Sequence, residues 1–313
     1  MSFHCRVGNS SLLLRTLSVL SLGRDSWATV AFTPTVVIFH TAGDEMSTTA
    51  TATLPSEMFL DYHVAGDVRF MVNLGAMCDA LTLLGAHAVA SAFIKVILAF
   101  PTSDGRLLVE LADQQRTAQT LLVTRGVKER LLDLRFSDAL TSNRVILRGD
   151  AAQEAVQDLV SLGCSDAEVM FLEGGGSGIM GGAATSSSTA PRVVLAGSKS
   201  VLGSINVSLN KSADSVLLLD IGDPAVKGKY LTSHLALAVG LHARALSSSI
   251  SRAVGQSGGG GGNPQQFFGD CGFEKLSLLL NQERQLCVLH QGREHDIQVA
   301  ISIVITPLFA GLD

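Results

Sequence analysis

The chain has 313 residues, which is enough for two domains of ordinary size. Charged residues make up 16% of it, against about a quarter in typical soluble domains, and its mean hydropathy is +0.35. This is too little charge for the surface of a monomer of this size, so we expect a permanent protein partner. The net charge of −5 excludes a uniformly basic nucleic-acid surface and leaves only a local basic patch.

Composition disfavours three further classes of protein. The longest apolar stretches are interrupted by Lys95 and Pro307 and fall short of the roughly 20 residues that span a membrane, so we expect no transmembrane helix. The five cysteines are odd in number and contain no C-x-x-C pair, which predicts neither a disulfide framework nor a zinc site. This pattern fits a reducing compartment.

The first predicted helix spans residues 9–23, where Leu13, Leu17 and Leu20 share one face. Residues 1–24 are also serine-rich, carry arginines and lack acidic residues, which is the composition of a mitochondrial presequence. We favour an ordinary first helix, because the same arrangement of cap, apolar stripe and Leu-Gly ending recurs later in the chain.

The stretch DVRFMVNLGAMCDALTLLG, residues 67–85, changes its apolar period halfway along. Its first part alternates as a half-buried strand does, whereas its second part has apolar residues at the three- and four-residue spacing of a helix face. Asn73 is predicted to cap the helix with its side chain, and Gly85 to end it in the left-handed conformation.

Two later stretches predict further helices. Residues 149–163 have Asp150 as the expected N-cap and a stop at Gly163. Their apolar stripe consists of Ala152, Ala155, Val156, Leu159 and Val160. Residues 231–249 are a fourth candidate with weaker ends, held by Leu235, Ala238, Leu241 and Leu246.

Only strand-like runs lie between these helices. They cover residues 27–33, 35–41, 57–64, 92–100, 106–112 and 119–124, and then 143–149, 167–173, 192–198, 214–220, 274–280, 285–291 and 297–305. Consecutive strands favour antiparallel pairing, because a parallel sheet needs a helix between most neighbours. We therefore predict an α+β fold and disfavour a Rossmann fold.

The most charged segment, residues 125–143, separates the two sets of elements. We predict that it connects a first domain, residues 1–124, to a second domain, residues 144–313. Two stretches rich in glycine and serine, 174–191 and 255–266, are expected to be mobile insertions in the second domain.

Two pseudo-repeated halves, each with two short helices and many strands, resemble the plan of the PCNA-like DNA sliding clamps. More narrowly, residues 68–85 and 131–159 are similar to the Rad-one subunit family of the heterotrimeric nine-one-one checkpoint clamp. The matching residues are Asn73, Leu74, Asp79, Leu81 and Gly85 in the first stretch and the pair Glu154 and Ala155 in the second. The two insertions depart from the family.

The resemblance implies a sliding-clamp fold and a non-catalytic subunit that uses no cofactor and no metal. Such a subunit joins two other clamp-like chains in a heterotrimer around double-stranded DNA at damage sites, without sequence specificity and without a membrane. The ring is placed by a clamp loader and serves as a nuclear platform for checkpoint signalling and repair. A subunit of a replicative homotrimeric clamp is the alternative.

The candidates for DNA contact are basic residues on or beside the helices and on loops of the second half. They are Arg15, Arg24, Lys199, Lys211, Lys227, Lys229, Arg244 and Arg252. Isolated surface charge explains each of them equally well. Asp150, Glu154 and Asp158 argue against a uniformly basic lining, because they share the polar face of helix 149–163.

A closed ring needs two different edges on each subunit. By the resemblance, these edges are the terminal strands of the two halves, which we place at 119–124 and 192–198. The interface candidates are Gln119, Thr120, Leu121, Leu122 and Val123, and Arg192, Val193, Val194 and Leu195. Arg192 and Lys199 flank the second edge and the first has no acidic residue to meet them, which favours pairing with different chains.

The connector is expected to be a docking surface for accessory proteins, with Leu132, Leu134 and Phe136 as its apolar contacts. Packing of these side chains on the sheet beneath is the alternative. A nucleotide-binding enzyme is a further alternative, because residues 174–182 contain G-x-G-x-x-G after a predicted strand. The motif needs a helix directly after it, and a serine-rich stretch ending in Pro191 follows instead.

Overall fold

The computed structural model describes residues 2–23, 25–43, 47–85, 94–127, 134–174, 190–200, 203–243, 273, 275–294 and 297–308. The chain divides into two compact units by its contacts. The first comprises residues 1–133, 242–272 and 291–302, and the second residues 134–241, 273–290 and 303–313.

The first unit consists of antiparallel sheets with two helices. Its elements are β1 (Ser2–Val7), α1 (Ser10–Leu20), β2 (Trp27–Phe32), β3 (Val36–Ala42), β4 (Thr48–Pro55), η1 (Ser56–Met58), β5 (Phe59–Ala65), β6 (Val68–Asn73), α2 (Leu74–Leu81), β7 (Lys95–Phe100), β8 (Leu107–Ala112), β9 (Thr117–Leu122) and β10 (Thr124–Arg125). One sheet has the order β5-β1-β7-β8-β9, and a second run has the order β10-β6-β2-β3-β4. The neighbour of β4 on its other side is β19 (Ile297–Ile305), which belongs to this unit up to Ser302.

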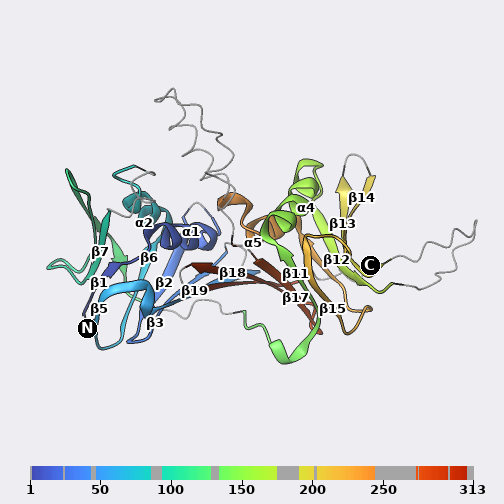
Figure 1. The fold of residues 1–313 in the computed structure, drawn as a ribbon, viewed down its shortest axis with the longest axis horizontal. Helices are drawn as coiled ribbons and strands as arrows, with labels where there is room; N and C mark the ends of the chain where they lie inside the picture. The colour runs from blue at the N-terminus through green and yellow to red at the C-terminus, as the bar shows by residue number, and fades with distance from the viewer. Residues whose placement is uncertain are drawn as a thin grey trace, which may run out of the picture. The chain divides into compact units, whose positions relative to one another are not determined.

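The helices of the first unit begin at side-chain caps. The Asn73 carboxamide oxygen accepts a hydrogen bond from the Ala76 N–H at 2.9 Å, as predicted, and Asn9 caps α1 through the Leu12 N–H at 2.8 Å. Gly85, which follows the end of α2, has the predicted positive φ of 99°. The two helices contact each other and lie on one side of their strands (Figure 1).

The core of the first unit joins its two layers of strands. Phe3 of β1 stacks on Phe32 of β2 with ring centroids 3.7 Å apart, and Phe70 of β6 stacks on Phe100 of β7 at 4.4 Å. The predicted apolar face of α1, Leu13, Leu17 and Leu20, is fully buried. Burial of each such side chain contributes about 1.5–3 kcal/mol. Residues 2–23 are therefore part of the folded domain, which counts against their being a presequence.

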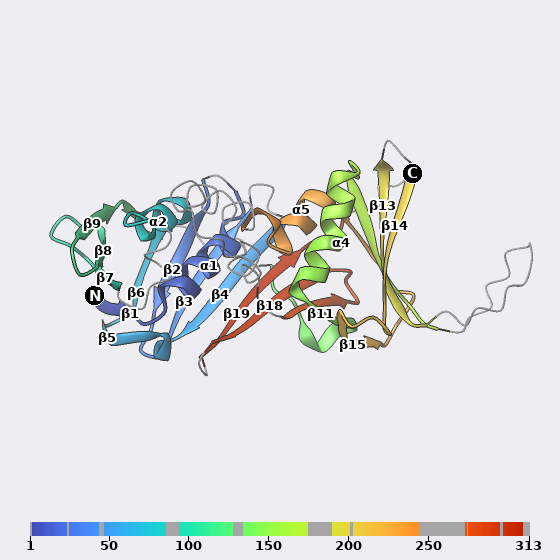
Figure 2. The same ribbon diagram turned by 45° about the horizontal axis from the view of Figure 1, so that its top comes forward.

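The second unit repeats this construction. Its elements are η2 (Asp138–Leu140), β11 (Thr141–Arg148), α4 (Gly149–Ser161), β12 (Asp166–Leu172), β13 (Arg192–Ser200), β14 (Gly203–Asn210), β15 (Val216–Ile221), β16 (Gly228–Leu231), α5 (Thr232–Ala238) and β17 (Lys275–Asn281), together with β18 (Leu286–Glu294) up to His290 and the end of β19 from Ile303. One sheet has the order β14-β13-β12-β16, and the other run has the order β19-β18-β17-β11-β15. Helices α4 and α5 contact each other (Figure 2).

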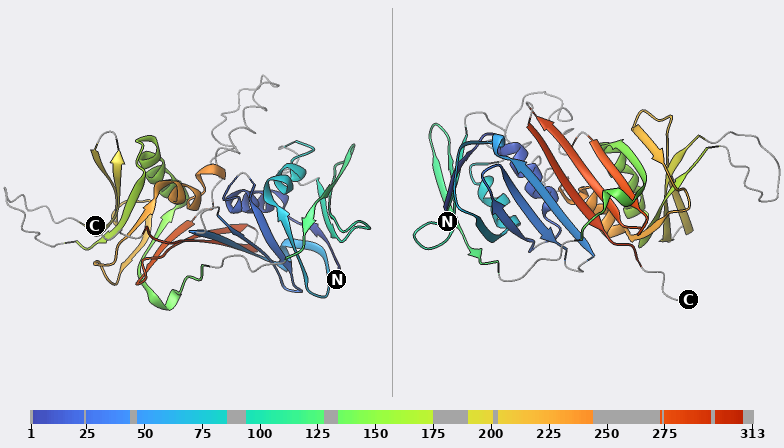
Figure 3. Two further views of the ribbon diagram at one scale, coloured as in Figure 1. Left: turned by 180° about the vertical axis from the view of Figure 1, so that it is seen from behind. Right: turned by 90° about the horizontal axis from the view of Figure 1, so that it is seen from below.

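The two halves of the chain share one topology. Each runs strand, helix, five strands, helix, three strands, and the first half then adds the two-residue strand β10. The order β5-β1-β7-β8-β9 corresponds to β15-β11-β17-β18-β19, and β6-β2-β3-β4 corresponds to β16-β12-β13-β14. Figure 3 shows the same elements from behind and from below. The predicted α+β class with two pseudo-repeated halves is confirmed.

Several predicted elements differ from the structure. The helix expected at 231–249 is interrupted after Ala238, where Gly240 has a φ of 77°, and residues 244–249 lie outside the described part. Asp150 is not the N-cap of α4, because the helix already begins at Gly149 and the Asp150 carboxylate accepts from the Ala151 N–H. Val160 is solvent exposed and does not belong to the buried stripe.

Four strands were not predicted: β1, β4, β14 and β16. Strand β4 alternates threonine with alanine, and β14 alternates serine and asparagine with single apolar residues, so neither has a strong apolar run. Strand β16 has only four residues. These strands gain stability from cross-strand neighbours, which a single-segment pattern does not contain.

Candidate subunit edges and DNA-facing surface

The described residues contain no group of three or more histidine, cysteine, aspartate or glutamate side chains arranged to hold a metal ion. No described helix is long and apolar enough to cross a membrane. The glycine-rich loop that suggested a nucleotide site, with Gly176, Gly178 and Gly181, lies outside the described residues, as does the insertion at 255–266.

The first predicted edge is an end strand. β9 is the last strand of its sheet and pairs only with β8 among the described strands. Its alternate residues Thr117, Gln119 and Leu121 are exposed, with Leu121 at 43% and the following Val123 at 62% exposed. The Gln119 carboxamide donates to the Glu110 carboxylate at 2.6 Å. The backbone of β9 thus has a free side that can pair with another strand.

The second predicted edge is wrong in its position. β13, which contains Arg192, Val193, Val194 and Leu195, pairs with β12 on one side and β14 on the other, so it is an interior strand. Its valines and Leu195 are buried accordingly.

The end strand beside β13 is β14, which the sequence analysis missed; β16 is the end strand on the opposite side of this sheet. Ile205, Val207 and Leu209 of β14 are half-buried and alternate with exposed Ser204, Asn206 and Ser208. This weak period-2 alternation is the signal that could have identified the strand. Neither β9 nor β14 contains a charged residue.

Two predicted DNA contacts are paired with acidic residues. The Lys229 ammonium lies 2.9 Å from the Asp166 carboxylate, and the Lys227 ammonium lies 3.0 Å from the Glu168 carboxylate. Both pairs link β12 to β16 or to the loop before it. Their positive charge is therefore largely balanced locally and is less available for phosphate.

Asp166 is nearly fully buried, and its carboxylate has three side-chain partners, Ser165, Ser198 and Lys229. Burial alone would raise the pKa of Asp166, but hydrogen bonds from Ser198, Lys229 and Ser165 together outweigh burial and lower the pKa below its usual value. The Ser165 hydroxyl donates to Asp166 at 2.8 Å, and the Ser198 hydroxyl also donates to it. The Lys229 side chain is thus held to the sheet by a carboxylate that stays ionised.

The remaining basic candidates are scattered. Arg15 is half-buried on α1, and Lys211 is exposed in the turn after β14. Lys199 lies on β13, but its side chain is outside the described part. Arg24, Arg244 and Arg252 are also outside the described residues.

The described helices expose more acidic side chains than basic ones to solvent. Asp79 on α2 and Asp150, Glu154 and Asp158 on α4 are all exposed, whereas Arg15 is the one lysine or arginine within the described helices α1, α2, α4 and α5. A helix surface of this charge repels phosphate. These four helices therefore do not form the basic surface that the sequence predicted for DNA contact.

The start of the connector is held against the first unit. β10 pairs antiparallel with β6, and the Arg125 guanidinium lies 3.8 Å from the centre of the Trp27 ring, a cation–π contact that the sequence did not indicate. Leu134 and Phe136 are half-buried, whereas Leu132 lies outside the described residues.

Comparison with known proteins was made for sequence and for structure. A family model described as "Repair protein Rad1/Rec1/Rad17" matches residues 3–251. No curated protein sequence matches. The crystal structure of proliferating cellular nuclear antigen from Entamoeba histolytica superposes with a TM-score of 0.70 at 11% identity, over 98% of this chain and 99% of that chain. PCNA from Thermococcus kodakaraensis gives a TM-score of 0.67 at 11% identity, over 98% of this chain and 100% of that one.

The likeness to the two PCNA structures extends over nearly all of both chains, so the predicted sliding-clamp fold is confirmed. The family match covers most of the chain, in agreement with the resemblance noted in its sequence. The chain belongs to the Rad1/Rec1/Rad17 family of repair proteins and has the fold of a DNA sliding clamp.

Proposed function

We propose that this chain is a non-catalytic subunit of a heterotrimeric ring that encircles duplex DNA at damage sites and serves as a platform for checkpoint signalling and repair in the nucleus. Residues 1–124 and 144–313 would be its two clamp domains, joined by the connector 125–143. The shared topology of the two halves supports this division.

The observation that carries the proposal is a pair of free edges. Within the chain, β4 has β19 as its neighbour. The counterparts of these two strands in the repeat are β14 and β9, and neither has a second neighbour among the described strands. The pairing made by β4 and β19 can therefore be made between β14 of one chain and β9 of the next. Such head-to-tail pairing generates a ring if the rotation closes.

Different partners are favoured over identical ones. β9 and β14 carry no charged residues, so charge gives the chain no means of selecting its own copy over a related one. The acidic helices also support partners that supply most of the basic surface for DNA. A clamp loader and sequence-independent DNA contact belong to the same proposal.

Sedimentation velocity of the purified chain tests the assembly. We expect a monomer or a poorly soluble protein alone, and a defined trimer when two different clamp-like chains of the same organism are co-expressed with it. Asn206→Lys with Ser208→Lys places charge at exposed positions of the β14 edge and should abolish the trimer. Leu60→Lys, on the exposed end strand β5, is the matched control and should leave it intact.

Two outcomes would contradict the proposal in different ways. A stable homotrimer of this chain alone would favour a replicative clamp. A soluble monomer that does not bind clamp-like chains would argue against any ring.

The connector is tested separately. Leu134→Ser with Phe136→Ser should weaken binding of accessory proteins without affecting ring formation, with Leu132 as a third contact. Loss of folding would instead place these side chains in the core.

A further inference from the structure

The end strand β15 of the second unit carries an unusual pair of exposed apolar side chains. Leu217 and Leu218 are 50% and 44% exposed, although the strand alternates elsewhere. β15 pairs with β11 on one side, and no described strand pairs with its other side. This surface does not take part in the ring edges β9 and β14.

A β-bulge explains the exposure. Ile146 of β11 is opposite Leu218, but the next residue, Leu147, is opposite Val216, so Leu217 is an extra residue in β15. A bulge of this kind breaks the alternation and turns neighbouring side chains toward one face. Leu219, opposite buried Val145, remains in the core.

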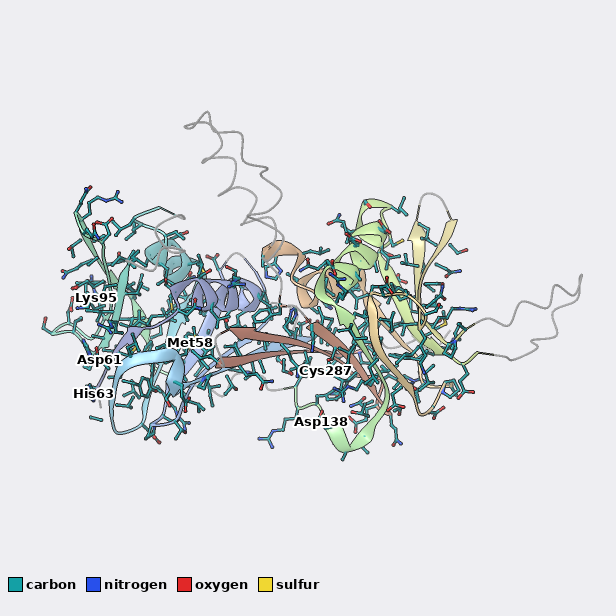
Figure 4. The ribbon with its side chains drawn as sticks, in the orientation of Figure 1. Met58, Asp61, His63, Lys95, Asp138 and Cys287 are labelled. Atoms are coloured by element: carbon teal, nitrogen blue, oxygen red, sulfur yellow. The ribbon has the colours of Figure 1, made fainter. Side chains whose placement is uncertain are left out.

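The equivalent strand of the first unit is protected in a way that β15 is not. β5 also has a bulge opposite β1, but it contains Asp61, whose φ is 53° and whose carboxylate lies 3.8 Å from the Arg6 guanidinium. Figure 4 labels Asp61 and His63 on this strand. Charged residues on an end strand discourage pairing with other chains. At the bulge of β15 the corresponding positions hold two leucines.

Acidic residues predominate along β15. Asp214 precedes the strand, Asp220 is its penultimate residue and Asp223 follows it, and all three are exposed. The nearest lysines in the sequence are Lys211, in the turn before Asp214, and Lys227, which pairs with Glu168. Arg144 of β11 is directly opposite Asp220 in the ladder, so it balances part of that charge, whereas Asp214 and Asp223 lie outside the ladder; Arg148, also on β11, has its guanidinium 3.9 Å from Asp150. The free edge therefore combines unpaired backbone, two leucines and acidic flanks.

We infer that β15 is a docking site for an extended peptide segment of a partner protein, in which apolar residues are flanked by lysine or arginine. The segment adds as a strand to the free edge, with backbone hydrogen bonds to β15. Its apolar side chains cover Leu217 and Leu218, and its basic residues face Asp214, Asp220 and Asp223. The site does not depend on ring assembly, so it can be tested on the isolated chain.

The test is selection of peptides from a random 12-residue display library against the full-length chain, followed by fluorescence anisotropy with synthetic copies. We expect enriched peptides with alternating apolar residues and flanking lysine or arginine. Leu217→Ser with Leu218→Ser should weaken their binding at least tenfold, and Leu60→Ser on β5 should leave it unchanged. Asp214→Lys, a change at an exposed residue, should weaken binding and reduce its salt dependence.

Strand addition has its own readout. N-methylation of alternate peptide residues removes backbone donors, so binding should be lost for one set of positions and retained for the other. Enriched peptides without basic residues, binding unaffected by the leucine changes, or tolerance of N-methylation at every position would each overturn the inference. A selection that enriches no peptide would show that the two leucines are ordinary exposed surface.

Discussion

The side chain of Asn143 fixes the loop between β15 and β16. It is fully buried, donates to the Asp223 carbonyl oxygen at 2.7 Å and accepts from the Asp223 N–H at 3.1 Å. The Val226 carbonyl oxygen lies 3.4 Å from the same amide nitrogen. Asn143→Ala removes all of these partners at once and leaves the loop backbone without them.

The expected cost follows from the groups left unsatisfied. A buried backbone group without a partner costs about 1–3 kcal/mol. Asp223 is exposed, so water can reach part of the freed backbone, and we expect a total cost close to that of one fully buried group, about 2 kcal/mol. This corresponds to roughly a 30-fold larger population of the open loop.

Amide hydrogen exchange measures the effect where it arises. Exchange at Asp223 should accelerate by about 30-fold, and urea unfolding should show a loss of about 2 kcal/mol in the transition of the second unit. Asn206→Ala, at an exposed asparagine on β14, is the control and should change stability by less than about 0.5 kcal/mol. Unchanged exchange at Asp223 in Asn143→Ala would refute the reasoning.

Three further predictions concern stability. Gly228→Ala should destabilise by about 1–3 kcal/mol, because its Cβ would overlap the ring of fully buried Tyr230; a thermal melt measures the loss, and an unchanged melting temperature would contradict it. Arg284→Gly should stabilise by about 0.5 kcal/mol in urea unfolding, because relief of its positive φ of 61° outweighs the added chain entropy of glycine, whereas a net loss would argue against strain. The folded pKa of Asp166 is lowered, so its stabilisation is present above the unfolded value and is lost as pH falls through the folded pKa; Asp166→Asn should therefore destabilise at neutral pH and progressively less below pH about 4, and a pH-independent difference would contradict this.

The sequence by itself determined the features that depend on neighbouring residues along the chain. The cap at Asn73, the left-handed Gly85 and the leucine face of α1 need only local geometry and side-chain spacing, so they were predictable. The repeat of the two halves was visible for the same reason. The resemblance to the checkpoint clamp family depended on these local patterns too.

The tertiary structure decided which strands are edges and which charges are free. β13 looks like an edge by composition, but pairing with β14 makes it interior, because the position of a strand is set by partners distant in sequence. From the sequence alone, Lys229 would be taken as a free cation. In the fold, β12 places the Asp166 carboxylate 2.9 Å from its ammonium group. The bulge that exposes Leu217 and Leu218 exists only relative to the register of β11. Strand order, register and ion pairing are properties of contacts between segments, and single-segment periodicity does not contain them.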